Sequence, residues 1–336
     1  MNKIFSSYNK LILINEVSFI GDSIIFFWPL VNAFSNTFPD KQICVFHPHY
    51  KRLKPLNENV TNQSLDEFYA QKLVDESSVI IAFIKSDGQM KEFLKSMGLQ
   101  SIVKGMVGMD FITFNLLETV ASENEYEQFI IDNTEIKYLF KNRETDSHSG
   151  FPLLKNPFSN VYEYAKILNE SFFGLETMYS ELQENIIINE VKSKESFADL
   201  FIPPSPAHSR KFILINLICG TYKQDVEEKY AYLLNWIKKV SSDAENEGLD
   251  VFLSADNMFP KLRSDLLHCS MNLYFLKEGS SLYWNALIKK ASKVYSIDTG
   301  FLHISHVLNK NTYGFGGDVD FWFFKDKIIR IEDFKL

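Results

Sequence analysis

Glycine and proline are scarce in this chain: 14 glycines and 10 prolines make up about 7% of 336 residues, against about 12% in average usage. Because few glycines are present, the location of each one is informative. Cysteine is also rare, since only Cys44, Cys219 and Cys269 occur, and they form no CxxC pair or Cys/His cluster. This pattern predicts neither a disulfide framework nor a structural zinc site, and it is typical of thiols in a reducing cytoplasm.

Long hydrophobic runs are absent too, because no 18 consecutive residues are apolar and uncharged. We therefore expect no membrane-spanning helix, and the short apolar run at 11–14 does not predict a secretory signal peptide. Basic residues are outnumbered, 35 to 43, which gives a net charge of −8. Binding to nucleic acid is not expected from such a chain, because that binding depends on Lys and Arg neutralising phosphates.

Positive charge gathers in one segment, His47–Lys54, which also carries Tyr50. Such a cluster could contact an anionic acceptor or lipid headgroups, or it could be an ordinary solvated loop. We expect a cytoplasmic protein, which either is free in the cytoplasm or also contacts the inner face of a membrane peripherally.

The hydrophobic pattern predicts an α/β protein. Hydrophobic residues make up 46% of the chain, enough for a sizeable core, and the length predicts two domains. Short apolar runs of strand length alternate with longer amphipathic stretches, as in βαβ units with buried parallel strands. The expected strands are 10–15, 42–46, 79–84, 101–107, 211–217, 250–254, 273–276, 294–297 and 312–315; the expected helices are 23–37, 90–97, 116–140, 159–173, 226–244, 258–269, 281–291 and 299–308.

Residues 201–209 (FIPPSPAHS) hold three of the ten prolines and form the best linker in the chain. The sequence therefore predicts two Rossmann-like, doubly wound domains, 1–200 and 211–336, joined by a Pro-rich linker at 201–210. We expect the domains to face each other across a cleft, with ligands at the carboxyl ends of the strands.

Residues whose side chains could take part in catalysis or ligand binding follow several of these strands. Gly21-Asp22 lies between the first strand and its helix, where a carboxylate either caps the helix or faces the cleft as an acid or base. Gly220, Thr221 and Lys223 occupy a similar turn and could serve a diphosphate. Asp256 follows the next strand and is either a helix cap or a partner for ribose hydroxyls.

The turn Asp298-Thr299-Gly300 is the strongest candidate, because an apolar strand ends there and a helix starts. Either Asp298 or Thr299 could be the helix N-cap, and the helix amides would suit a phosphate. His303, one turn further on, is either a ligand for the same group or a core histidine. A cluster of three glycines (Gly314, Gly316 and Gly317) indicates a tight turn or close approach to a ligand.

Two segments that include these turns resemble a known protein family. The first is Ile20-Gly21-Asp22 followed by Trp28-Pro29-Leu30-Val31 and Phe38-Pro39; the second is the run 296–310 (SIDTGFLHISHVLNK), followed by Gly314-Phe315-Gly316. Together they resemble the ADP-heptose:lipopolysaccharide heptosyltransferase family, glycosyltransferase family 9.

The resemblance implies a GT-B fold and metal-independent, inverting sugar transfer, with no cofactor beyond a nucleotide diphospho-sugar such as ADP-heptose. It implies that Asp22 is the general base on the acceptor hydroxyl. The donor would contact Thr221, Lys223, Asp256, Asp298, Thr299, Gly300 and His303, and backbone would approach a ligand closely at Gly21, Gly220 and Gly316. The acceptor would be a glycan, lipid-linked or protein hydroxyl.

Two other functions fit the same pattern. One is a non-catalytic module that binds a nucleotide sugar and has lost turnover. The other is a GT-B enzyme of another kind, a nucleotide-sugar hydrolase or epimerase. Product analysis separates all three.

Overall fold

The computed structural model describes residues 9–16, 20–71, 78–83, 107–108, 166, 175–191, 193–202, 211–218, 230–254, 260–266, 272–277, 280–297, 299–315 and 328–330. Within them the chain forms two compact units, which divide between Asn185 and Ile186. The sequence predicts the boundary later, at the Pro-rich segment, of which only Phe201–Ile202 is described. That pair forms a strand of the second unit's sheet.

The first unit is built on a parallel sheet with strand order β3-β2-β1-β4-β5. Its strands are β1 (Lys10–Asn15), β2 (Gln42–Phe46), β3 (Val60–Gln63), β4 (Ser78–Phe83) and β5 (Val107–Gly108). Its described helices are α2 (Ile20–Asp22), the π-helical turn η1 (Ser23–Phe27), α3 (Trp28–Thr37), α4 (Leu65–Gln71) and α9 (Leu182–Asn185). Continuous burial along β1 and β2 matches their uninterrupted apolar sequences, as expected when both faces of a sheet are covered.

The second unit has a seven-stranded sheet of order β12-β11-β10-β7-β8-β9-β6, in which only β6 is antiparallel. The strands are β6 (Phe201–Ile202), β7 (Phe212–Asn216), β8 (Asp250–Ser254), β9 (Leu273–Leu276), β10 (Lys293–Ile297), β11 (Thr312–Phe315) and β12 (Ile328–Arg330). Counted from β7, the parallel strands have the Rossmann order 3-2-1-4-5-6.

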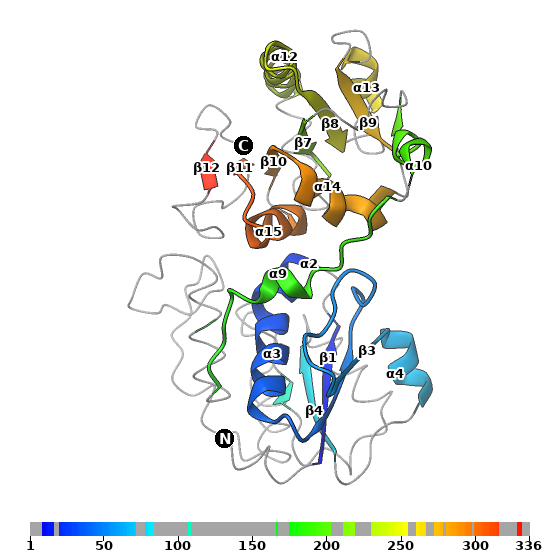
Figure 1. Cartoon of the computed structure of the whole chain (residues 1–336), viewed down its shortest axis with the longest axis vertical. Coiled ribbons are helices and arrows are strands. Elements are labelled where there is room, and N and C mark those ends of the chain that lie inside the picture. The colour runs from blue at the N-terminus through cyan, green and yellow to red at the C-terminus, as the bar shows by residue number, and fades with distance from the viewer. Residues whose placement is uncertain are drawn as a thin grey trace, which may run out of the picture. The chain divides into compact units, whose positions relative to one another are not determined.

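Helices cover both faces of this second sheet, with α12 and α13 on one face and α14 and α15 on the other (Figure 1). They are α10 (Lys194–Ala198), α12 (Tyr230–Asn246), α13 (Pro260–Leu266), the 3-10 turn η2 (Ser280–Tyr283), α14 (Trp284–Lys290) and α15 (Gly300–Val307). The predicted fold class, two Rossmann-like doubly wound α/β domains, is confirmed.

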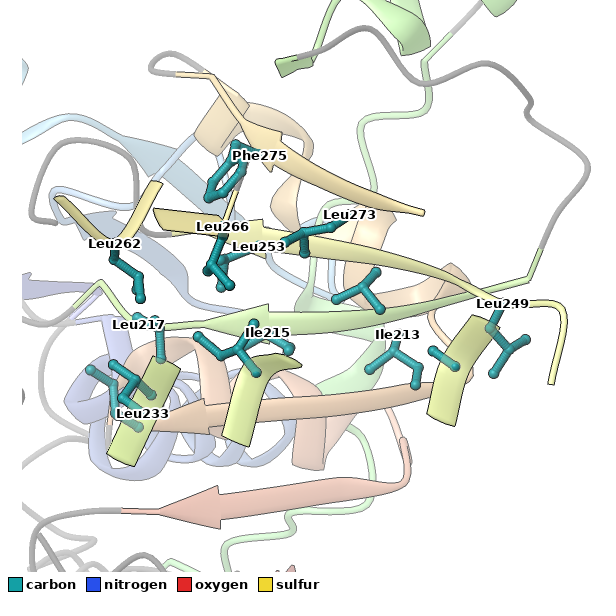
Figure 2. Packing of buried hydrophobic residues seen from close by; sticks show 14 residues of the cluster. Ile213, Ile215, Leu217, Leu233, Leu249, Leu253, Leu262, Leu266, Leu273 and Phe275 are labelled. Carbon is teal, nitrogen blue, oxygen red and sulfur yellow. The ribbon is translucent and has the colours of Figure 1, made fainter. Parts of the chain in front are cut away.

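Side-chain alternation in β7 explains how the two faces differ. Ile213 and Ile215 point into an apolar cluster under α12 and α13, where Leu233 and Leu262 also lie (Figure 2). Because successive side chains of a strand point to opposite faces, Asn216 belongs to the other face, on which α14 and α15 lie. The helix-capping turn at Thr299 begins on that face.

The structure corrects the start of the first helix. The sequence predicts a turn at Gly21-Asp22 and a helix from Ser23, but helical structure begins at Ile20, so Asp22 is not the helix N-cap. The helical structure continues directly into a π-helical turn at 23–27, whose residues are all buried. Such turns are rare and occur frequently at functional sites.

Several predicted segments lie outside the described residues, namely the helices at 90–97 and 116–140, all but Val107 of the strand at 101–107, and all but Lys166 of the helix at 159–173. None of the described helices is both long and apolar enough to cross a membrane.

Candidate functional site

The carboxyl edge of the second sheet provides the main candidate site, because strand order reverses there between β7 and β10. Ligands of doubly wound proteins bind outside the strands' carboxyl ends at this reversal. The chain leaves β7 at Asn216 and β10 at Ile297, and the sequence predicts a turn after each of these strands, at 220–223 and at 298–300. Because β7 and β10 are parallel neighbours, the ends of the strands that precede these two predicted turns lie at one edge of the sheet.

Thr299 is the N-cap of α15. Its backbone is extended (φ −157°, ψ 169°), and its Oγ1 accepts a hydrogen bond from the Phe301 N–H at 3.3 Å. The Thr299 carbonyl accepts from the Leu302 N–H at 2.9 Å, which closes the first turn. This decides the alternative left open by the sequence between Asp298 and Thr299 as cap. Gly300 follows as the first helical residue and places no side chain beside these amides.

We predict that Thr299→Val lowers the free energy of unfolding of the second unit by about 1 kcal/mol, because the cap oxygen is lost while valine suits the extended backbone. Thr299→Ser is the matched control, since it keeps the oxygen. Urea unfolding of both variants checks this, and equal stability of the valine and serine variants would contradict the capping role.

His303 is buried, with 4% of its surface exposed. Burial, with a smaller contribution from His306, lowers its pKa to about 3. In the ligand-free chain the ring is therefore neutral near pH 7. The contact of His303 with the donor stays a prediction.

A row of buried polar residues lies at the carboxyl ends of three neighbouring strands, next to the candidate site. Ser254, Asn216 and Ser296 are register neighbours on β8, β7 and β10, and each is at most 1% exposed. Among the described residues, the Ser254 hydroxyl has no hydrogen-bond partner. This row was not predicted from the sequence, although one signal was present: the same Ile-Leu-Ile-Asn sequence ends β1 and β7, with a polar residue where the apolar run stops.

The corresponding edge of the first sheet holds the second candidate site. Asn15, the last residue of β1, donates from Nδ2 to Ser23 Oγ at 2.8 Å, and both residues are buried. This bond ties the end of the strand to the residue that follows Asp22. The backbone of Asp22 lies in α2 and Gly21 is buried there, but the side chain of Asp22 lies outside the described structure.

The basic segment 47–54 is only partly solvated. His47 is fully buried, its ring packs near those of Phe27 and Trp28, and its Nε2 lies 2.7 Å from Asn62 Oδ1. Burial lowers its pKa to about 3, and burial also lowers the pKa of Arg52 to about 10. The exposed charge of the segment is therefore that of Lys51 and Lys54.

The remaining predicted contacts, Thr221, Lys223, Asp256, Asp298, Gly220 and Gly316, lie outside the described residues. Within the described part of the chain, no group of three or more His, Cys, Asp or Glu residues is placed to hold a metal ion.

Two solved structures are similar to this chain in fold over most of its length. A glycosyl transferase family 9 protein from Veillonella parvula matches with a TM-score of 0.58 at 9% identity, over 97% of this chain and 87% of that one. The ADP-heptose LPS heptosyltransferase II of E. coli matches with a TM-score of 0.54 at 14% identity, over 95% of this chain and 89% of that one. No protein-family model and no curated protein matches the chain in sequence.

The chain therefore has the two-domain α/β fold of family 9 glycosyltransferases. Among the solved proteins with this fold, it is similar along nearly its whole length to the heptosyltransferase II of E. coli.

Proposed function

We propose that this chain is a glycosyltransferase that moves a heptose-like sugar from a nucleotide diphospho-sugar to a hydroxyl group. The acceptor is a glycan, a lipid-linked sugar or a protein. The observation that carries this proposal is the Thr299-capped start of α15 at the strand-order reversal of a Rossmann sheet, in a chain with the family 9 fold. One protein of this fold is an ADP-heptose enzyme, so ADP-heptose is the first donor to test.

In the proposed reaction, Asp22 takes the proton from the acceptor hydroxyl as its oxygen attacks the anomeric carbon of the donor. The new glycosidic bond forms as the bond to the diphosphate breaks, and the nucleoside diphosphate leaves with the electron pair. Attack opposite the leaving group inverts the anomeric configuration. The reaction needs no metal in this proposal.

Negative charge grows on the leaving diphosphate as this bond breaks. A helix N-terminus carries partial positive charge and suits such an anion, so we assign the diphosphate to the start of α15. The Thr299 hydroxyl and Lys223 add a hydrogen bond and a point charge. Because burial lowers the pKa of His303 in the ligand-free chain, we assign the positive potential of the proposed site to the helix and Lys223.

A thermal-shift panel of ADP, GDP, UDP, CDP and ADP-heptose tests the proposal. One nucleoside diphosphate should stabilise the protein specifically, by about 2.7 kcal/mol at a concentration of 100 Kd. Incubation of the matching nucleotide sugar with an acceptor should then yield a glycoside. No stabilisation by any member of the panel would overturn the proposal, and release of free sugar as the only product would replace transfer with hydrolysis.

A further inference from the structure

The side chain of Asn216 makes four hydrogen bonds at the strand-order reversal, one of them a long bond from Nδ2 to the Ile218 carbonyl at 3.5 Å. The Ile218 backbone N–H donates to its Oδ1 at 3.4 Å, which identifies the other end of the amide as the nitrogen. Nδ2 donates to Ser296 Oγ at 3.1 Å and to Thr299 Oγ1 at 3.2 Å. One buried side chain therefore links the residues that leave β7 to the cap of α15.

The hydrogen bonds around Thr299 also determine whether its hydroxyl acts as a donor or an acceptor toward a further partner. A hydroxyl oxygen has two acceptor sites and one proton. Both acceptor sites of Thr299 Oγ1 are occupied, by the N–H of Phe301 and the amide of Asn216. The Thr299 hydroxyl can therefore bond a further partner only by donating its proton to it.

Its partner within the described structure is a weak one. Ser296 Oγ lies 3.4 Å from Thr299 Oγ1, at the long end of the range for O–H···O bonds. Ser296 uses its own proton on the Ile297 carbonyl, at 2.8 Å. An anionic oxygen at the start of α15 would be a better acceptor, because hydrogen bonds to charged groups are shorter and stronger.

We propose that Asn216 is a positioning residue, which holds the Thr299 hydroxyl as a donor toward the diphosphate of the sugar nucleotide and so sets affinity for it. This inference rests on the proposed function, because it assigns the diphosphate to the start of α15. Asn216 acts through Thr299 and does not itself contact the ligand.

Two substitutions separate bond direction from bond loss. Asn216→Asp keeps the shape but replaces both N–H donors with an acceptor oxygen, so the Thr299 proton turns inward to the new carboxylate. Asn216→Ala removes the bonds without adding charge, and it keeps the test decisive if the first variant does not fold.

Asn272 offers a matched control in the same unit. It is 4% exposed, and its side chain bonds to the Ser241 hydroxyl and to the carbonyls of Ser241 and Leu249 at 2.9–3.2 Å. It lies immediately before β9, at the opposite edge of the sheet from the proposed site. Asn272→Asp and Asn272→Ala therefore disturb a comparable buried network away from the ligand.

The experiment measures ADP affinity by calorimetry and the hydrogen exchange of residues 299–303 in ligand-free protein, for the wild type and all four variants. We expect Asn216→Ala to bind ADP about 10-fold more weakly, because the hydrogen bond from Thr299 to the charged diphosphate is weakened. We expect Asn216→Asp to bind ADP about 100-fold more weakly, because the new carboxylate also draws the Thr299 proton away from the diphosphate. Exchange at 299–303 should rise in both. The Asn272 variants should lose stability but keep the affinity for ADP and the exchange at 299–303.

Each outcome is decisive. Wild-type affinity for ADP in stably folded Asn216 variants would overturn the inference and leave the proposed function standing. If the wild type binds ADP and the Asn272 variants lose as much affinity as the Asn216 variants, Asn216 is merely structural. If the wild type binds no nucleoside diphosphate but exchange at 299–303 rises only in the Asn216 variants, the proposed function fails while the positioning of Thr299 is supported.

Discussion

Replacing Asp22 with asparagine should lower kcat for sugar transfer about 10²–10⁴-fold, because the amide has the same shape but cannot take a proton. Affinity for the donor nucleotide should stay unchanged, since the proposed diphosphate site is built from the second unit. The proposed base should also produce the acidic limb of the pH profile of kcat, which flattens in Asp22→Asn. Steady-state kinetics across pH and calorimetry with ADP measure the two effects.

Asp66→Asn is the matched control for this prediction. Asp66 is an exposed carboxylate in the first turn of α4, in the same unit, and its change to asparagine should leave kcat at the wild-type level. If Asp22→Asn also retains wild-type kcat, Asp22 is not the base. The assignment of the donor to α15 would then still be judged by nucleotide binding.

The second large effect is a loss of stability in mild acid, caused by His47 and His303. Burial lowers the pKa of each ring to about 3 in the folded protein, whereas an unfolded histidine titrates near 6.5. Below pH 6.5 the unfolded chain binds protons that the folded chain does not, so stability is full above that pH. It is lost as pH falls toward 3, by about 1.4 kcal/mol per pH unit for each ring.

Urea unfolding between pH 4 and 8 measures this effect, and His47→Gln and His303→Gln isolate it. Carboxylates also titrate in this range, so the informative quantity is the difference in slope between each variant and the wild type. Because His47 belongs to the first unit and His303 to the second, each variant should flatten the pH dependence of its own unit. Unchanged slopes would show that the rings become protonated within the folded protein.

The strands at 250–254 and 273–276 were predicted with the bounds that the structure shows. They were predictable because a strand buried on both faces needs a continuous apolar run, and such a run is visible in the sequence. The alternation of these runs with amphipathic helices also predicted the fold class. In contrast, β3 (Val60–Gln63) was missed, because its polar sequence VTNQ forms a strand only through pairing with β2.

The start of the first helix shows a different limit. A glycine beside an aspartate is typical of a turn, yet Gly21 and Asp22 are helical, and the next residue, Ser23, is bonded to Asn15. A polar partner eight residues away and burial of the π-helical turn outweigh the local preference. The sequence contains both residues, but their contact depends on where β1 ends.

The sequence by itself determined that this chain is a two-domain α/β protein, and it located the turn at Asp298-Thr299-Gly300, because apolar periodicity and helix caps are local properties. Only the tertiary structure decided that Thr299 is the cap, that His303 is neutral, and that Asn216 is bonded to Ser296 and Thr299. These features depend on the pairing of β7 with β10 and on burial beneath α15. Strand register and desolvation arise between segments about 80 residues apart in the sequence, and no local pattern records them.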